Sequence, residues 1–108
     1  MNIKQLALAA FAKEAPQLTP SIEVLEDMDT PFYVFRITET SGDPPLYAGF
    51  KVRAVSPAGA GLSLFRRAIK FQAMHSARSL AYTRRTGLTS EPNEQGIIEA
   101  RRLFEVSA

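Results

Sequence analysis

The chain contains no cysteine, no tryptophan and a single histidine among its 108 residues. The lack of cysteine excludes a disulfide scaffold, a thiolate-bound zinc ion and a thiol nucleophile, and it is consistent with a reducing, cytoplasmic location. No apolar run approaches the about 18 residues that cross a bilayer, so we expect no membrane span. The apolar stretch 4–12 is short for a secretory signal and is followed directly by Lys13 and Glu14. We therefore expect it to belong to an ordinary first helix.

The length of the chain is typical of one domain, and we expect residues 1–108 to form a single unit. Hydrophobic residues make up 45% of the chain, which suffices for a core without disulfides or metal.

The charged residues are unevenly distributed along the chain. Residues 1–50 hold three Lys or Arg against seven Asp or Glu, whereas residues 51–108 hold ten against four. The second half therefore favours polyanions or acidic proteins as partners.

The local patterns of the first half predict one helix and three strands. Asn2 is a suitable N-cap for a helix over 3–15, which is rich in Ala and Leu and is stopped by Pro16. The apolar residues of this helix occupy most of its circumference, so we expect it to be well buried or shared with another chain. β-branched and aromatic residues then predict strands over 22–25, 32–38 and 46–55. Because their connections are short and rich in turn residues, we expect an antiparallel meander.

The second half predicts a long helix from Ser63, as N-cap, to Arg85, with Gly87 beyond its end. A last helix is expected from about residue 93 to Val106. The predicted fold class is therefore α+β, in the order α-β-β-β-α-α, with a three-stranded antiparallel sheet packed against the long helix. Helical spacing predicts the apolar side of the long helix, widened by four further residues: Leu62, Phe65, Ile69, Ser76 and Leu80, with Leu64, Phe71, His75 and Tyr82.

The opposite side of the long helix is the main candidate for a binding surface. It carries six basic residues and no acidic residue lies between them: Arg66, Arg67, Lys70, Arg78, Arg84 and Arg85. Exposed helices usually mix both signs of charge. The pattern is compatible with a nucleic-acid contact, with an acidic protein partner, or with a solvated surface that has no partner. Lys51 and Arg53, which alternate with apolar residues in the third strand, and Ser63 are candidate secondary contacts.

Catalytic, metal and cofactor sites have little support. Ser63 and His75 are roughly 18 Å apart along a helix, so they cannot act together, and we expect a packed or interface histidine. Glu26, Asp27 and Asp29 lack the spacing of a calcium loop, which favours a solvated turn. The Gly59-Ala60-Gly61 turn precedes a helix start but lacks the lysine of a nucleotide-binding loop. We therefore expect no enzyme, no metal and no cofactor.

One family shares part of this pattern. Gly59, Gly61 and Ser63 ahead of a helix with basic and small residues resemble the turn and second helix of the double-stranded-RNA-binding domain, if Leu64 and Phe65 are an insertion; the matching helix residues are Arg66, Arg67, Lys70, Ala73 and Ala77. The resemblance covers roughly residues 2–86 and implies an α-β-β-β-α order with phosphate contacts from Arg66, Arg67 and Lys70. The first hairpin loop departs from it, because its acidic residues stand where the family approaches RNA.

These patterns predict a small binding module whose basic helix engages a polyanionic surface, above all the nucleic-acid backbone. Few aromatic residues are expected to be free for base stacking, which favours backbone contacts over sequence reading. The alternative is a protein-interaction module, either an adaptor or inhibitor that docks on an acidic or nucleic-acid-binding site of a larger protein, or a homodimer formed through the first or last helix.

Overall fold

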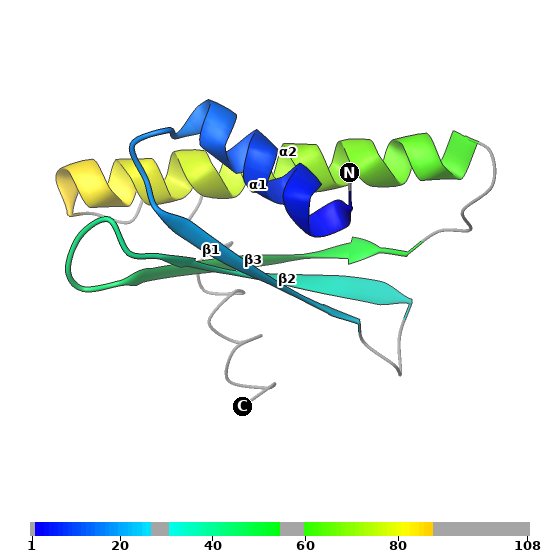
Figure 1. Ribbon diagram of the computed structural model, residues 1–108, viewed down its shortest axis with the longest axis horizontal. Helices are drawn as coiled ribbons and strands as arrows, with labels where there is room; N and C mark the ends of the chain where they lie inside the picture. Colours follow the sequence, from blue (N-terminus) through cyan, green and yellow to red (C-terminus); the bar gives the residue numbers. More distant parts are fainter. Residues whose placement is uncertain (1, 27–30, 55–59, 88–108) are drawn as a thin grey trace.

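The computed structural model describes residues 2–26, 31–54 and 60–87. Three antiparallel strands form one sheet in the order β1-β2-β3, and two helices lie side by side across one of its faces (Figure 1). The element bounds are α1 (Ile3–Glu14), β1 (Pro20–Glu26), β2 (Phe32–Glu39), β3 (Leu46–Arg53) and α2 (Ala60–Thr86). The predicted α+β class, with its sheet packed against a long helix, is confirmed. The predicted last helix lies outside the described residues.

Of the three residues predicted to mark helix ends, two do so in the structure. Asn2 caps α1 in a reciprocal capping box with Gln5, in which each side chain accepts a hydrogen bond from the other residue's backbone amide. Gly87 follows α2 with φ of 73°, the left-handed conformation that glycine adopts without strain. The prediction of Ser63 as N-cap is wrong, because α2 already begins at Ala60 and Ser63 lies exposed inside the helix.

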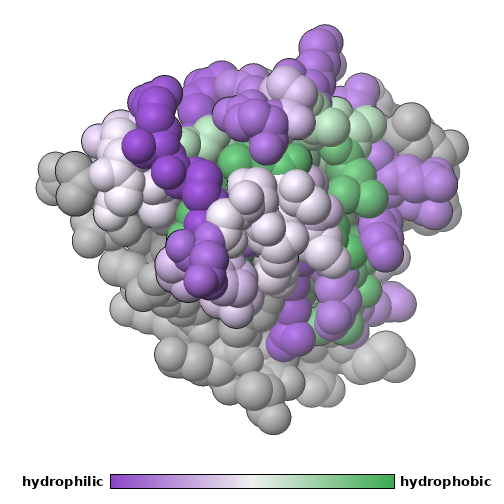
Figure 2. All heavy atoms as spheres, turned by 60° about the vertical axis from the view of Figure 1, so that its left-hand side comes forward, coloured by the Kyte–Doolittle hydropathy of each residue, from purple (hydrophilic) through white to green (hydrophobic). Residues whose placement is uncertain are grey.

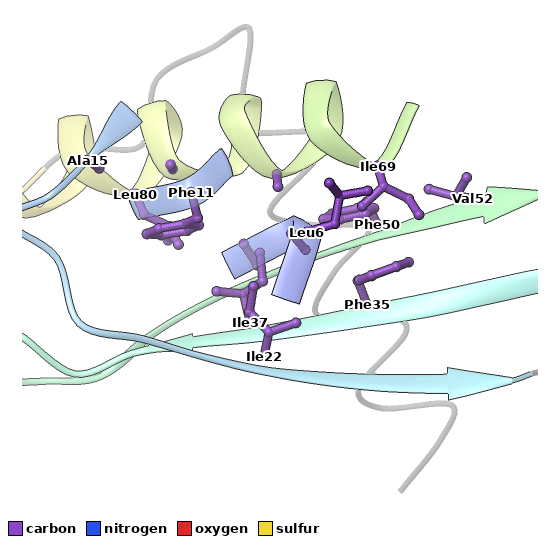
Figure 3. Close-up of a cluster of buried hydrophobic side chains, with 14 of the residues drawn as sticks. Leu6, Phe11, Ala15, Ile22, Phe35, Ile37, Phe50, Val52, Ile69 and Leu80 are labelled. Atoms are coloured by element: carbon purple, nitrogen blue, oxygen red, sulfur yellow. The ribbon is translucent and has the colours of Figure 1, made fainter. Parts of the chain in front are cut away.

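The core fills the space between the sheet and the helical layer (Figure 3). Strand alternation directs Ile22, Phe35, Ile37 and Phe50 toward the helices, and the rings of Phe35 and Phe50 stack with centroids 4.6 Å apart. The buried helical residues of the same core cluster are Leu6, Ala7, Phe11, Phe65, Ile69, Ala73, Ala77 and Leu80. The predicted core row of α2 is confirmed from Phe65 to Leu80, whereas Leu62 is partly exposed.

A buried ion pair joins the end of α2 to the end of β2. Glu39 is placed on the core-facing side by the alternation of β2, and its side chain is 0% exposed. One carboxylate oxygen accepts hydrogen bonds from the amides of Thr19 (3.0 Å) and Ser41 (2.7 Å), and the other accepts from Nε of Arg84 (2.7 Å). Because both carboxylate oxygens accept hydrogen bonds and one of them faces the guanidinium group, the cost of burying the charge is offset.

Arg84 connects three segments through its remaining donors. Its Nη1 donates to the carbonyl of Pro44 (2.8 Å), and its Nη2 donates to the carbonyl of Glu39 (3.0 Å). A Cβ atom added at Gly42 would lie 3.1 Å from the Arg84 side chain, so a larger residue there would require the guanidinium group to shift by a few tenths of an ångström. The pair therefore fixes α2, the end of β2 and both neighbouring connections at one end of the molecule.

We expect Arg84→Met to lower the free energy of unfolding by about 3 kcal/mol, because it leaves a fully buried carboxylate without its cationic partner. Urea denaturation at pH 7 measures this difference. Arg85→Met is the matched control. The Arg85 side chain is exposed, so this substitution should change the free energy of unfolding by no more than about 0.5 kcal/mol. Equal effects of the two substitutions would contradict the structural role of the pair.

The same carboxylate predicts a pH dependence. Burial raises the pKa of Glu39, but the hydrogen bonds from Ser41, Thr19 and Arg84 outweigh burial and hold the pKa below its ordinary value of 4.5. The folded protein therefore binds fewer protons than the unfolded chain. The contribution of the ionised group is complete above about pH 4.5 and is lost as the pH falls through the lower folded pKa.

We accordingly expect Glu39→Gln to reduce the free energy of unfolding at pH 7, and the gap to the wild type to narrow below pH 4.5. Denaturant titrations at a series of pH values measure the gap. Glu23→Gln serves as the control, because its side chain is 61% exposed and the substitution should have little effect at any pH. A gap that stays constant or widens in acid would contradict the assigned ionisation.

Candidate functional site

The six predicted basic residues of α2 do not form one uniform exposed edge. Arg84 turns inward to Glu39. Arg78 reaches α1, where its Nε lies 2.8 Å from Oε1 of Glu14, but its side chain remains 62% exposed. Arg85 is exposed and lies over the ring of Tyr82 at 5.7 Å. Two of the six are thus paired with carboxylates of this chain.

The other three predicted cations lie on the first half of α2. Arg67 and Lys70 are exposed and Arg66 is half-buried, and none of the three forms an ion pair within the described residues. A charged side chain without an internal partner keeps its full capacity for an external anion, whereas an exposed pair such as Arg78–Glu14 contributes little to stability and can be exchanged. The first half of α2 therefore holds the strongest unpaired positive charge on the helix.

Apolar side chains interrupt this cationic surface. Leu64 is 61% exposed and Phe71 is 60% exposed, although helical spacing predicts both on the buried side. His75 is also exposed, so of the two predicted roles, packed or interface histidine, the packed one is wrong and the interface one stays a prediction. The part of the α2 surface that packs on the sheet and on α1 is narrower than the apolar side predicted from the sequence. Three strands and a short helix cannot cover the whole of that predicted side. Large exposed apolar side chains close together are typical of interaction surfaces.

A groove of about 650 Å³ runs between the two helices on the outer side of the helical layer. Both helices line it, with small and apolar residues between the charged ones: Leu6, Ala9, Ala10, Lys13 and Glu14 from α1, and Arg67, Lys70, Phe71 and Met74 from α2. Figure 2, in which the end of α2 and the β2–β3 connection come forward, shows apolar surface among hydrophilic side chains on the helical side of the molecule.

The rim of the groove is predominantly positive. Lys13 stands on α1, and Arg67 and Lys70 stand on α2, all three without an ion pair in the described part of the chain. Among the described residues that line the groove, Glu14 is the one acid, and Arg78 already neutralises it. The groove therefore combines an apolar floor with cationic walls, a combination that suits a ligand with both apolar and acidic groups.

Sequence reasoning did not assign the α1 half of this groove. The available signal was the Ala-rich and Leu-rich composition of 3–15, which indicated a helix with more apolar surface than one contact needs. Ala9 and Ala12 are indeed exposed in the structure. The position of α1 beside α2 depends on tertiary packing, which no local pattern specifies.

The remaining predicted sites are not assembled near the groove. Lys51 and Arg53 are exposed on the sheet face opposite to the helices, each 5.9 Å from the ring of Phe32, and Ser63 lies in the first turn of α2. Glu26 ends β1 in an exposed position, whereas Asp27, Asp29 and Gly59 lie outside the described residues. The described residues contain no group of three His, Asp or Glu residues that would hold a metal ion. Neither described helix is long and apolar enough to cross a membrane.

No protein-family model, curated protein or solved structure matches this chain. The resemblance to the double-stranded-RNA-binding domain therefore stays a prediction, although the described order of elements is the one that the resemblance implies.

We expect Phe71→Gln to leave the free energy of unfolding within about 0.5 kcal/mol of the wild type, because the ring is mostly in water. The matched core substitution, Phe11→Ala, should lower it by about 3–5 kcal/mol, since Phe11 is fully buried. Thermal and urea denaturation compare the two. A large loss with Phe71→Gln would show that the ring serves the fold and is not available to a partner.

Proposed function

We propose that this protein is a non-enzymatic protein-interaction module whose helical layer docks on an acidic partner protein. The observation that carries the proposal is the exposed Phe71, which lies at an apolar groove beside Arg67 and Lys70, two cations with no ion pair among the described residues. A ring left in water contributes little to folding but gains roughly 1.5–3 kcal/mol when a partner buries it. An adaptor or an inhibitor would use such a surface, because both need affinity without chemistry.

The charge distribution supports an acidic partner. α2 contains no acidic residue over its 27 residues, so no group on this helix repels an approaching carboxylate. Opposite charges at the rim accelerate association and select the partner, while burial of apolar side chains at the centre supplies most of the affinity. The groove has this arrangement, with cations at its walls and alanine, leucine and methionine side chains between them.

Nucleic-acid binding is the second candidate, and it is favoured by Arg66, Arg67 and Lys70, which form no ion pair within the part of the chain that the structure describes. Phosphate contacts use cations and backbone amides, and they gain nothing from Leu64, Phe71 or Met74. Such binding would weaken steeply as the salt concentration rises. We rank it second because the apolar residues stand in the middle of the cationic surface.

We expect the immobilised wild-type protein to retain a specific protein from a nuclease-treated extract of its own cells, and the double variant Arg67→Glu/Lys70→Glu to lose it. The charge reversal places carboxylates against an acidic partner and should reduce affinity at least about a hundredfold, since close like charges cost several kcal/mol. Lys51→Glu/Arg53→Glu is the matched control: it makes the same change in net charge on the opposite face of the sheet. Its retention should equal that of the wild type.

A gel-shift panel with duplex RNA, duplex DNA and single strands at low and physiological salt separates the two candidates. Retention of a nucleic acid that Arg67→Glu/Lys70→Glu abolishes, together with no specific protein in the extract, would overturn the proposal in favour of the second candidate. Equal loss of the protein with both double variants would also overturn it, because net charge and not the helical surface would then govern retention.

A further inference from the structure

The groove between α1 and α2 is bounded by two matching rows of side chains. Leu6, Ala9, Ala10 and Lys13 follow one another along α1 at positions i, i+3, i+4 and i+7, and α2 repeats this spacing with Arg67, Lys70, Phe71 and Met74. Each row covers one side of a helix over about two turns, roughly 10 Å. The groove is therefore bounded on both sides by rows of helical side chains, and we call it the trough.

We infer that this groove binds one amphipathic α-helix with an apolar stripe flanked by acidic residues on both sides. The inference rests on the proposed protein-binding function and specifies the partner's structure. A third helix lying along the trough would place its own i, i+3, i+4 and i+7 side chains between the two rows. An extended strand would need unpaired backbone groups along the groove, whereas the lining presents side chains of two helices.

The positive charges on both walls of the groove are the reason that we expect acidic residues on both sides of the partner helix. Lys13 stands on the α1 side, and Arg67 with Lys70 stands on the α2 side, so a carboxylate on either flank of the entering helix finds a cation. A second copy of this chain packed groove to groove is disfavoured as the occupant. Groove-to-groove packing would bring two cationic rims together, and α2 has no acidic residue to relieve the repulsion.

The residues at the floor of the groove indicate which kind of apolar side chain of the partner would bind there. Ala9 and Ala10 are small and leave room opposite Phe71 and Met74, so a bulky aliphatic or aromatic side chain of the partner can enter between the helices. Anchors of this kind at the centre of an interface dominate binding free energies. The expected partner segment therefore has one large apolar residue within the stripe and Asp or Glu at neighbouring positions.

A displayed library of random peptides of about 15 residues, long enough to form a helix on binding, tests the inference with the intact protein as bait. We expect the enriched peptides to share apolar residues at i, i+3 or i+4, and i+7, with an excess of Asp and Glu. Circular dichroism of a synthesised peptide should show helix gained on binding. Enrichment of peptides without this spacing, or no enrichment, would overturn the inference.

Ala9→Trp blocks the trough without changing charge, and Ala9 is exposed, so the fold should tolerate it. We expect it to weaken binding of the enriched peptides at least about tenfold, whereas Ala12→Trp, on the exposed side of α1 outside the groove, should change affinity by less than about twofold. Ala9→Gln replaces the Trp variant if denaturation shows that the latter does not fold. Fluorescence anisotropy measures the affinities.

The variants distinguish failure of this inference from failure of the proposed function. If Arg67→Glu/Lys70→Glu abolishes binding of the partner protein while Ala9→Trp does not, the partner uses the cationic surface outside the groove; the inference fails and the proposed function stands. If neither variant affects binding, both fail. If both variants abolish it and the Ala12→Trp protein binds normally, the groove is the site.

Discussion

The buried pair of Glu39 and Arg84 determines how α2 is rotated about its own axis. A buried carboxylate without a cationic partner is strongly destabilising, so the side of α2 that carries Arg84 faces Glu39 at the end of β2. At 3.6 residues per turn, Phe71 then lies roughly 140° around the helix from Arg84, on the outer side. The exposure of Phe71 and the position of Arg67 on the groove are consequences of this orientation. The surface that we propose for binding therefore depends on an interaction at the far end of the helix.

The fold could be predicted from the sequence because each element carries a strong local signal. The Ala-rich segment after Asn2 specifies α1 and its cap, and the runs of β-branched and aromatic residues specify the strands to within a few residues. The alternation of β2 even contained the signal for Glu39, which falls in the same set as Phe35 and Ile37. An acidic residue at a core-facing position indicates that a basic residue is buried beside it. Which of the basic residues this is follows only from the three-dimensional arrangement.

The candidate site was predictable only in part. The excess of positive charge on 63–85 identified the relevant helix, and Arg67 and Lys70 lie on the groove. The assignment of Leu64 and Phe71 to the buried side was wrong, because periodicity counts apolar positions but not the area available to cover them. The α1 wall, with Ala9, Ala10 and Lys13, has no charge pattern or motif, and alanines at a binding surface look the same in sequence as alanines in a helix core.

The close contact of α1 with α2 brings together two segments from opposite ends of the described chain. Ala7 on α1 and Ala73 and Ala77 on α2 are fully buried, and such small side chains suit a close approach of two helices. The trough exists only once the chain between α1 and α2 has folded and the two helices are in contact. During synthesis, a nascent chain that has released α1 and the sheet but not yet α2 has neither the second wall nor most of the positive charge. For the binding that we propose, the site is therefore complete only after translation has passed the end of α2.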